Sequence, residues 1–302
     1  MIDRRTFITA SSLAAIGAGL PAMPLWAAKA LQQRPIPSSG EMLPVIGMGT
    51  SGSFEVKPGS PEQLALRDVL RRFFDAGASM IDTSPNYSNA EDILGELLVA
   101  QDLRAKTFLA TKLAADNRAA GEAQFAQSLQ RLHSDRIDLL QVHNLRDWRT
   151  QLGLARELKA QGKVRYIGVT HYLDTAHDTL ADVVKAEKPD FLQINYSVAS
   201  THAEKRVLPM ARDLGVAVII NRAFEDGKLF AQVANRALPT WAAQVGVSSW
   251  AQLFLKFALS HPAVTVVIPA TGKPHRQSDN LGAGYGATLD QAQRDELKAM
   301  FG

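Results

Sequence analysis

The sequence has no cysteine among its 302 residues. Without thiols, the chain can form no disulfide, no zinc–thiolate site and no cysteine nucleophile. A lack of cysteine also suits a protein that must avoid mispaired thiols in an oxidising compartment. The histidines are not spaced like pairs of metal ligands, so we expect no metal site. The scattered histidines are His133, His177, His202, His261 and His275.

The chain also has little excess charge of either sign. It contains 33 Lys and Arg against 30 Asp and Glu, a formal net charge of +3. The two signs are interspersed and no basic stripe is interleaved with aromatic residues, so we expect no nucleic-acid partner. Beyond the N-terminus, no apolar run is long enough to cross a bilayer. We expect a monomer.

A complete glycine-rich nucleotide fingerprint is missing as well. The Rossmann fold needs Gly-x-Gly-x-x-Gly directly after its first strand. Gly47-Met48-Gly49 has no third glycine, and no acidic partner for a ribose follows about 20 residues later. The sequence shows no internal repeat and no low-complexity segment. An open, doubly wound dinucleotide-binding sheet is therefore disfavoured.

The first 30 residues have the organisation of an export signal. The basic pair Arg4-Arg5 precedes a short apolar stretch, and small residues follow up to Ala30. This order predicts a signal peptide over residues 1–30, the alternative being a buried N-terminal helix or a membrane anchor. The arginine pair and the Thr-Phe-Ile after it resemble a twin-arginine signal, which implies recognition by that export machinery and a periplasmic location. Residues 31–44, rich in Pro, Ser and Gly, are interpreted as a linker.

Eight short apolar runs alternate with amphipathic stretches from residue 45 onward. Several runs are continuously apolar, as expected for strands buried on both faces of a parallel sheet. Eight such strands with intervening helices fit a closed barrel better than an open sheet. We therefore expect the α/β class and a single-domain (β/α)8 TIM barrel over residues 45–302. The expected strands are Val45–Thr50, Ser79–Thr83, Thr107–Lys112, Ile137–His143, Val164–Thr170, Phe191–Tyr196, Val216–Arg222 and Val264–Ala270.

The helical stretches carry start and stop signals. Ser60 suits an N-cap, Pro61 suits the first helical position, and Gly77 suits the position after the helix ends. The stretch Phe224–Gln244 has no clear pattern and is interpreted as a long loop. Further helices are expected over Ala90–Ala100, Arg118–Leu132, Leu152–Ala160, Thr175–Glu187, Ala203–Leu214, Ser248–Ser260 and Asp290–Met300.

Ionisable residues stand at the carboxyl ends of neighbouring expected strands. Asp82 ends the second strand, Lys112 the third and His143 the fourth. Tyr87 lies in the loop that follows Asp82. Because active sites of such barrels form at the carboxyl ends of the strands, we expect these four side chains to converge on one mouth.

The motifs around these residues resemble the aldo-keto reductase family over about residues 43–297. Taken together the motifs are specific, whereas Asp-Thr-x-x-x-Tyr alone would be weak. The resemblance implies a barrel that transfers hydride between a nicotinamide nucleotide and a small carbonyl substrate. The matching segments are Asp82–Tyr87 with Glu91–Gly95, Ala110–Lys112, Arg136–His143 and Gly162–Thr170.

Carbonyl reduction needs a hydride on carbon and a proton on oxygen. An ordinary tyrosine has a pKa of about 10, and an ammonium group beside it lowers that pKa. We interpret Tyr87 as the general acid, Lys112 as the group that lowers its pKa, and Asp82 as the partner of Lys112. His143 is interpreted as a hydrogen-bond donor that orients the substrate oxygen. The structural alternatives are a plain ion pair, a satisfied core histidine and a tyrosine that anchors its loop.

The resemblance also implies a nicotinamide site along the mouth. Thr170 and Gln193 stand where the family holds the carboxamide. His171 stands where the family often has Asn. Asn221 stands where an aromatic residue commonly stacks on the nicotinamide, and Arg222 is an alternative cover for the ring. Thr50, at the end of the first strand, is also expected at this site.

The segment after the eighth strand resembles the family's adenosine-phosphate segment. A cation there can neutralise a ribose 2′-phosphate, and arginine does so with two parallel hydrogen bonds. Many relatives have Lys at Ala270, and its absence here weakens the assignment. We favour NADP(H) and keep NAD(H) open. The expected contacts are Thr271 as a hydroxyl donor, Lys273 and Arg276 for the phosphate, and Asp279 and Asn280 for the adenine.

The substrate itself is not encoded in a recognisable motif. Trp148 and Trp241 are expected as walls of its pocket. If the protein is exported, no freely recycled NADPH pool is expected around it. Two alternatives therefore stay open: internal redox on a retained nucleotide, as in sugar epimerisation or isomerisation, and a non-catalytic nucleotide-binding barrel.

Overall fold

The computed structural model describes residues 30–301 and shows a closed barrel of parallel strands. Eight strands pair in sequence order, and bridges from Ile46 to Val267 and from Gly49 to Ala270 join the first strand to the last. All eight expected strands, the α/β class and the single (β/α)8 domain are confirmed. The strands are β3 (Met48–Gly49), β4 (Met80–Asp82), β5 (Phe108–Leu113), β6 (Ile137–His143), β7 (Val164–Thr170), β8 (Phe191–Asn195), β9 (Ala217–Asn221) and β10 (Val264–Val267).

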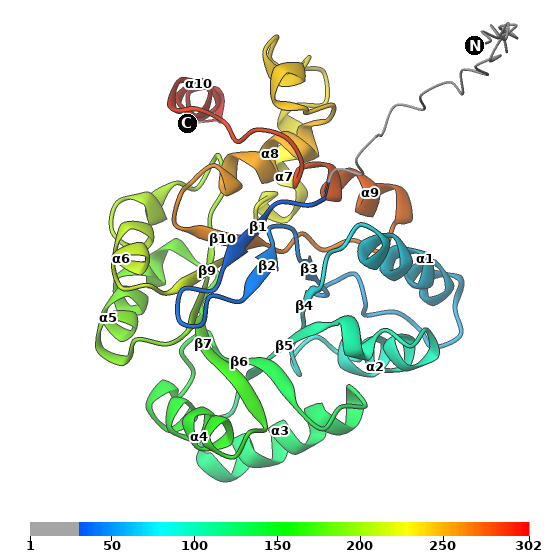
Figure 1. Ribbon diagram of the computed structural model, residues 1–302, viewed down its shortest axis with the longest axis vertical. Coiled ribbons are helices and arrows are strands. Elements are labelled where there is room, and N and C mark those ends of the chain that lie inside the picture. Colours follow the sequence, from blue (N-terminus) through cyan, green and yellow to red (C-terminus); the bar gives the residue numbers. More distant parts are fainter. Residues whose placement is uncertain (1–29, 302) are drawn as a thin grey trace, which may run out of the picture.

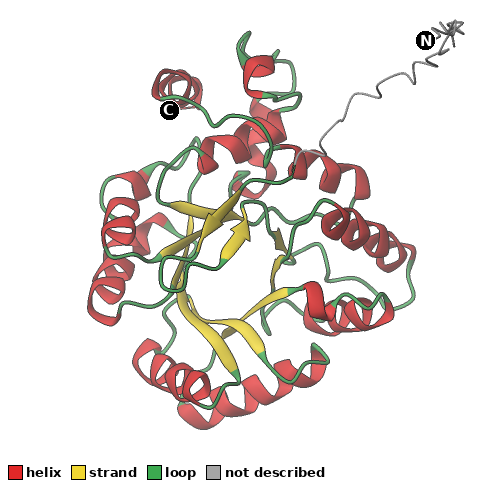
Figure 2. Cartoon of the chain, in the orientation of Figure 1, coloured by secondary structure: helices red, strands yellow, loops and turns green. Residues whose placement is uncertain are grey.

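Helices surround the strands on the outside of the barrel (Figure 1, Figure 2). The predicted cap at Ser60 is present, because its hydroxyl accepts from the Gln63 N–H at 3.3 Å. Two helices were not predicted: α7 lies inside the expected long loop, and α9 forms the segment after the last strand. The helices are α1 (Pro61–Asp75), α2 (Ala90–Ala100), α3 (Arg118–Arg131), α4 (Trp148–Ala160), α5 (His177–Glu187), α6 (Val207–Asp213), α7 (Lys228–Gln232), α8 (Trp250–Leu259), α9 (Pro274–Gly282) and α10 (Gln291–Phe301).

The apolar core lies in two layers. One layer fills the barrel and includes Phe108, Tyr166 and Phe191, whose rings pack 5.6–6.1 Å apart. The other layer lies between the strands and the surrounding helices. Because both faces of each strand are buried, the strands read as continuous apolar runs. The filled interior holds the strand ends, and the side chains on them, in fixed positions.

Glycine allows the barrel to close tightly. A Cβ atom on Gly49 would lie 2.9 Å from the carbonyl oxygen of Ile268, closer than a real side chain permits. Gly95 makes a similar contact outside the barrel, where α2 packs on α3. A Cβ atom there would lie 2.0 Å from the carbonyl oxygen of Arg131. These two positions therefore require glycine for packing.

Residues 31–44 form part of the fold, so the interpretation of this segment as a linker is wrong. They contain an antiparallel hairpin of β1 (Gln33–Pro35) and β2 (Met42–Pro44), drawn across the end of the barrel in Figure 1. Ile36 and Leu43 are buried in the layer that fills the barrel. The hairpin thus closes one end of the interior with apolar side chains, which a linker would leave exposed.

The predicted export signal falls outside the described residues except for Ala30. Over residues 30–301, no helix combines the length and the apolar character needed to cross a membrane.

Candidate active site

Asp82 and Lys112 form a buried ion pair at the carboxyl ends of β4 and β5. The Lys112 Nζ donates to Asp82 Oδ2 at 2.6 Å and to the Thr83 carbonyl oxygen at 2.7 Å. Burial acts to lower the pKa of Lys112. The Asp82 carboxylate and the Tyr87 phenol outweigh this effect, so the net pKa is raised. The lysine is therefore held as a cation with the carboxylate as its counter-ion.

Tyr87 lies next to this ion pair, in the loop between β4 and α2. The Lys112 Nζ is 5.0 Å from the centre of the Tyr87 ring. Burial raises the pKa of the Tyr87 phenol, and the Lys112 cation opposes that rise. The net pKa is above the ordinary value. The lysine thus acts in the expected direction, but it does not overcome the effect of burial on the pKa of the phenol.

His143 lies beside Tyr87 at the end of β6. The two rings are 5.9 Å apart and nearly perpendicular. Burial, and after it the charges of Lys112 and His171, lower the pKa of His143 to about 3. His143 is therefore a neutral imidazole at ordinary pH. Its Nδ1 lies 3.0 Å from the Ser84 Oγ.

The second oxygen of Asp82 is held by two glutamine side chains. The Nε2 atoms of Gln141 and Gln193 donate to Asp82 Oδ1 at 2.8 and 3.0 Å. Gln193 was expected at the mouth, but Gln141 was missed. It lies two residues before His143 on the same strand, so both side chains point to the same face. That spacing could have indicated its place in the site.

A large cleft opens over these residues, with a volume of about 1440 Å³. Asp82, Tyr87 and His143 line it, whereas Lys112 lies beneath the surface. The cleft continues to α9, so the mouth and the segment after the last strand belong to one cavity. The residues expected to contact a nucleotide that line the cleft are Thr50, Thr170, Gln193, Asn221, Arg222, Thr271, Lys273, Arg276, Asp279 and Asn280.

Three expected residues are not among those that line the cleft. His171 caps its own loop, because its Nδ1 accepts from the N–H groups of Tyr172 and Leu173 at 3.1 and 3.2 Å. Trp241 donates from its indole N–H to Glu296 on α10 at 2.8 Å. Trp148 begins α4 and lies under the Arg149 guanidinium, 4.3 Å from it. The structure does not place these three side chains where we expected them.

Tyr172 contributes to the cleft in place of His171. The Arg222 guanidinium lies 5.1 Å from the centre of the Tyr172 ring, and both residues line the cleft. Arg222 also pairs with Asp226. Its φ of 52° is in the left-handed region, which is uncommon for a residue other than glycine. Tyr172 was not predicted at the cleft, because no pattern in that loop indicates which side chain turns inward.

The start of α9 presents two cations to the cleft, Lys273 at the N-cap and Arg276 in the first turn. Lys273 and Arg276 are exposed, and within residues 30–301 neither forms an ion pair. Asp279, by contrast, is engaged: its carboxylate accepts from Ser249 Oγ at 2.8 Å and from Gln252 Nε2 at 2.7 Å. The two free cations, together with the N–H groups at the start of the helix, make this end of the cleft suited to an anion.

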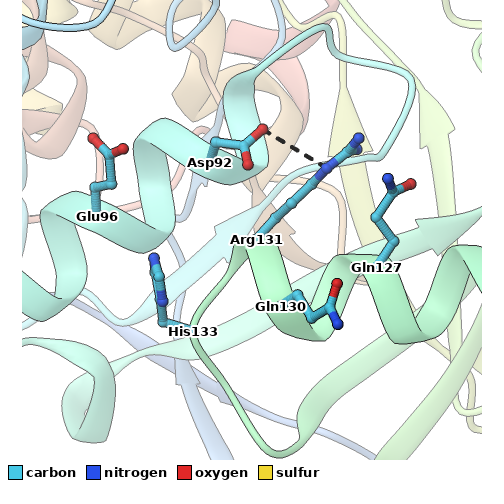
Figure 3. Close-up of a pocket in the computed structure, with 6 residues that line it drawn as sticks. All are labelled: Asp92, Glu96, Gln127, Gln130, Arg131 and His133. Carbon is cyan, nitrogen blue, oxygen red and sulfur yellow. Dashed lines mark ion pairs between the residues drawn. The ribbon is translucent and has the colours of Figure 1, made fainter.

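A second, smaller pocket lies on the outer wall of the barrel between α2 and α3 (Figure 3). Its volume is about 270 Å³. An ion pair of 3.7 Å between Arg131 and Asp92 closes one side. Asp92 and Glu96 come from α2, whereas the cleft lies at the strand ends. Within residues 30–301, no group of three or more His, Asp or Glu side chains is arranged to hold a metal ion.

Comparison with known proteins identifies the family. The model of the Aldo/keto reductase family matches residues 45–301. The chain belongs to the aldo/keto reductase family. It is 30% identical to aldo-keto reductase YhdN of Bacillus subtilis over 58% of this chain and 56% of that relative. It is 23% identical to the NADH-specific methylglyoxal reductase of Escherichia coli, over 89% of this chain and 94% of that protein.

Solved structures of the family have the same fold. A crystal structure of an aldo-keto reductase from Klebsiella pneumoniae in complex with NADPH superposes with a TM-score of 0.74. The two sequences are 24% identical, and the match covers 90% of this chain and 95% of that one. This likeness establishes the barrel architecture of the aldo-keto reductase described above.

Proposed function

We propose that this aldo-keto reductase is an NADPH-dependent oxidoreductase that converts an aldehyde or ketone into an alcohol, with Tyr87 as the general acid. The observation that carries the proposal is the position of Tyr87. At the wall of the large cleft, its ring lies 5.0 Å from the buried Lys112 cation and 5.9 Å from the neutral His143 imidazole. A proton donor, a cation that stabilises its conjugate base and a neutral hydrogen-bonding group are what carbonyl reduction requires.

The cleft suits a nicotinamide nucleotide. Its two ends differ in chemistry: the amides and hydroxyl of Gln193, Asn221 and Thr170 lie at the mouth, and two cations that form no ion pair within residues 30–301 lie at α9. Lys273 and Arg276 would hold the ribose 2′-phosphate, which favours NADPH. Thr271 and Asn280 line the same cleft and would contact the adenosine. The family accommodates both nucleotides, because one relative is named as NADH-specific and one solved structure contains NADPH.

The nucleotide would supply the hydride that the substrate carbon receives. The chain supplies the proton and the orientation. His143 is neutral, so it can donate one hydrogen bond to the carbonyl oxygen without carrying a charge. The Ser84 Oγ lies 3.0 Å from His143 Nδ1 and also accepts from the Asn86 N–H at 3.2 Å. In this scheme the Ser84 hydroxyl donates to Nδ1, and the imidazole hydrogen is on Nε2.

Tyr87 then gives its hydroxyl proton to the same oxygen as the carbon takes up the hydride. The O–H bond of the phenol breaks, the O–H bond of the alcohol forms, and a phenolate remains. The Lys112 cation beside the ring stabilises this phenolate until solvent returns a proton through the open cleft. Asp82 does not touch the substrate in this scheme and acts by holding Lys112 in place.

The proposal is tested by isolating the full chain and measuring nucleotide content, nucleotide exchange and the reduction of a panel of aldehydes, ketones and sugars. Rapid exchange with NADPH-dependent reduction supports a reductase. Tight retention with interconversion of sugars and no net oxidation of nucleotide indicates internal redox instead. Binding of nucleotide with no turnover on any substrate indicates a binding barrel and contradicts the proposal.

A further inference from the structure

A chain of side-chain amides connects the buried ion pair to the cleft. The amide nitrogens of Gln141 and Gln193 both donate to Asp82 Oδ1. The Gln193 Nε2 also donates to the Gln141 Oε1 at 3.0 Å. The Asn221 Nδ2 donates to the Gln193 Oε1 at 3.2 Å. Four strands, β4, β6, β8 and β9, therefore contribute one connected polar network under the mouth.

The charge at one end fixes the direction of every amide in the network. The carboxylate that pairs with Lys112 can only accept hydrogen bonds, so both glutamines must turn their NH2 groups towards Asp82. The oxygen of Gln193 must then face Asn221. Asn221 in turn must present its NH2 group to that oxygen. The usual ambiguity between the oxygen and nitrogen of an amide is removed here by Asp82.

The result is one acceptor without a partner. The Asn221 Oδ1 is buried and accepts no hydrogen bond within the described part of the chain. Asn221 lines the cleft beside Thr170 and Gln193. A buried carbonyl oxygen without a donor is unfavourable, so this position calls for an N–H or O–H group from a ligand.

Gln193 is less available for a ligand than expected from the sequence. Its NH2 group already serves two acceptors, and its oxygen already accepts from Asn221. The amide of Asn221 ends the network and has its oxygen free. Asn221, at the end of β9, is thus better placed for the ligand contact that we expected from Gln193 on β8.

We infer that the Asn221 Oδ1 accepts a hydrogen bond from the amino group of the nicotinamide carboxamide and thereby selects a nucleotide that carries that amino group. The inference rests on the proposed function, because it assumes that a nicotinamide lies at the mouth. Asn221 is a positioning residue in this account. Its hydrogen bond fixes the rotation of the nicotinamide ring. The orientation of the Asn221 amide is set in turn by the Asp82 carboxylate, through the Gln193 side chain.

The test compares two ligands that differ at this one group. NADPH carries a carboxamide, whereas the reduced 3-acetylpyridine analogue keeps the carbonyl and replaces the amino group with methyl. Equilibrium dissociation constants are measured by fluorescence titration of the full chain, without substrate and without turnover. We expect the wild type to bind NADPH about tenfold more tightly than the analogue, the scale of one lost hydrogen bond to a buried acceptor.

Asn221→Leu removes the acceptor at similar side-chain size. In this variant the ratio of the two dissociation constants should fall to about one, because the Asn221 Oδ1 that distinguishes the two ligands is gone. The variant also removes the donor to the Gln193 Oε1, and this loss is the same for both ligands. Ser53→Ala is the matched control. Its hydroxyl lies at the same cleft but hydrogen-bonds only to backbone carbonyls, so the wild-type ratio should persist. Circular dichroism checks that each variant is folded.

Two results overturn the inference and are distinguishable from failure of the proposed function. Equal affinity of the wild type for NADPH and the analogue overturns it without any variant. A ratio in folded Asn221→Leu equal to that of the wild type assigns the discrimination to another residue and also overturns it. If the wild type binds neither NADPH nor NADH, the proposed function falls, and this inference falls with it.

Discussion

The Lys112 ammonium and the Asp82 carboxylate are in contact at 2.6 Å, with side chains only 1% and 3% exposed. The side chains at the mouth of the cleft contact this pair or lie next to it. Tyr87 lies next to its cation, and the two glutamines hold the far oxygen of its anion. The pair therefore serves both the proton donor and the amide network that leads to Asn221.

Breaking the pair from one side should be more harmful than removing it. Lys112→Met leaves a buried carboxylate without its counter-ion, and Asp82→Asn leaves a buried ammonium. We expect each single variant to lose about 3–5 kcal/mol of unfolding free energy. The double variant should lose less than either single variant, because no uncompensated charge remains. Urea unfolding measures all four proteins, and fully additive losses would contradict the coupling.

Low pH should destabilise the protein partly through His143. Its folded pKa of about 3 lies below the ordinary value of 6.5. The unfolded chain therefore takes up the proton first, and the stability present above pH 6.5 is lost as pH falls towards 3. Between these two pH values, the slope of the unfolding free energy against pH should approach about 1.4 kcal/mol per pH unit. In His143→Gln this contribution should vanish. If plots of unfolding free energy against pH for the two proteins stay parallel as pH falls below 6.5, the prediction is wrong.

Arg276 should decide between the two nucleotides. A guanidinium can bind a 2′-phosphate with two hydrogen bonds, and NADH has no such group. We expect Arg276→Ala to raise the dissociation constant for NADPH about tenfold or more and to leave that for NADH within about twofold. Calorimetric titration with both nucleotides measures this, with NADH as the internal control. If the dissociation constants for NADPH and NADH rise equally, Arg276 does not bind the 2′-phosphate.

The strands and the mouth residues could be predicted because their signals are local. Buried parallel strands read as apolar runs, and their last polar residues, such as Asp82, Lys112 and His143, must share one end of the barrel. The cap at Ser60 depends on neighbours only three residues away. Where the sequence alone determines the contact, the structure agrees with the expectation.

Contacts between distant residues could not be predicted in the same way. The hairpin of residues 31–44 is rich in Pro, Ser and Gly like a linker, and only its fit to the barrel end reveals Ile36 and Leu43 as core. Trp241 looked like a pocket wall, but its partner is a glutamate 55 residues later. The amide network likewise depends on four strands meeting. The spacing of Gln141 from His143 could have indicated its face of the strand, but neither its bond to Asp82 nor the free oxygen of Asn221 could be found from the sequence.

Residues 1–30 carry a separate prediction. We propose, from their sequence alone, that they direct export of the folded protein to the periplasm through the twin-arginine machinery. Replacing the pair with Arg4→Lys and Arg5→Lys keeps the charge and removes the arginine signature. Fractionation of cells expressing the full chain should then find the protein retained in the cytoplasm. Export of the Lys-Lys variant at the wild-type level would rule out this route.

The central claim, that the Tyr87 phenol donates the proton, is tested most directly with Tyr87→Phe. This substitution keeps the ring beside Lys112 and removes only the hydroxyl. Tyr172→Phe is the matched control, because it removes a tyrosine hydroxyl from the same cleft.

The decisive measurement is the rate of NADPH oxidation in a single turnover with saturating carbonyl substrate, alongside the nucleotide dissociation constant. We predict that Tyr87→Phe slows the turnover about 10²–10⁴-fold, the contribution of a positioned general acid. Its affinity for NADPH should stay unchanged, and Tyr172→Phe should react at a rate close to that of the wild type. Turnover by Tyr87→Phe at the wild-type rate would contradict the account.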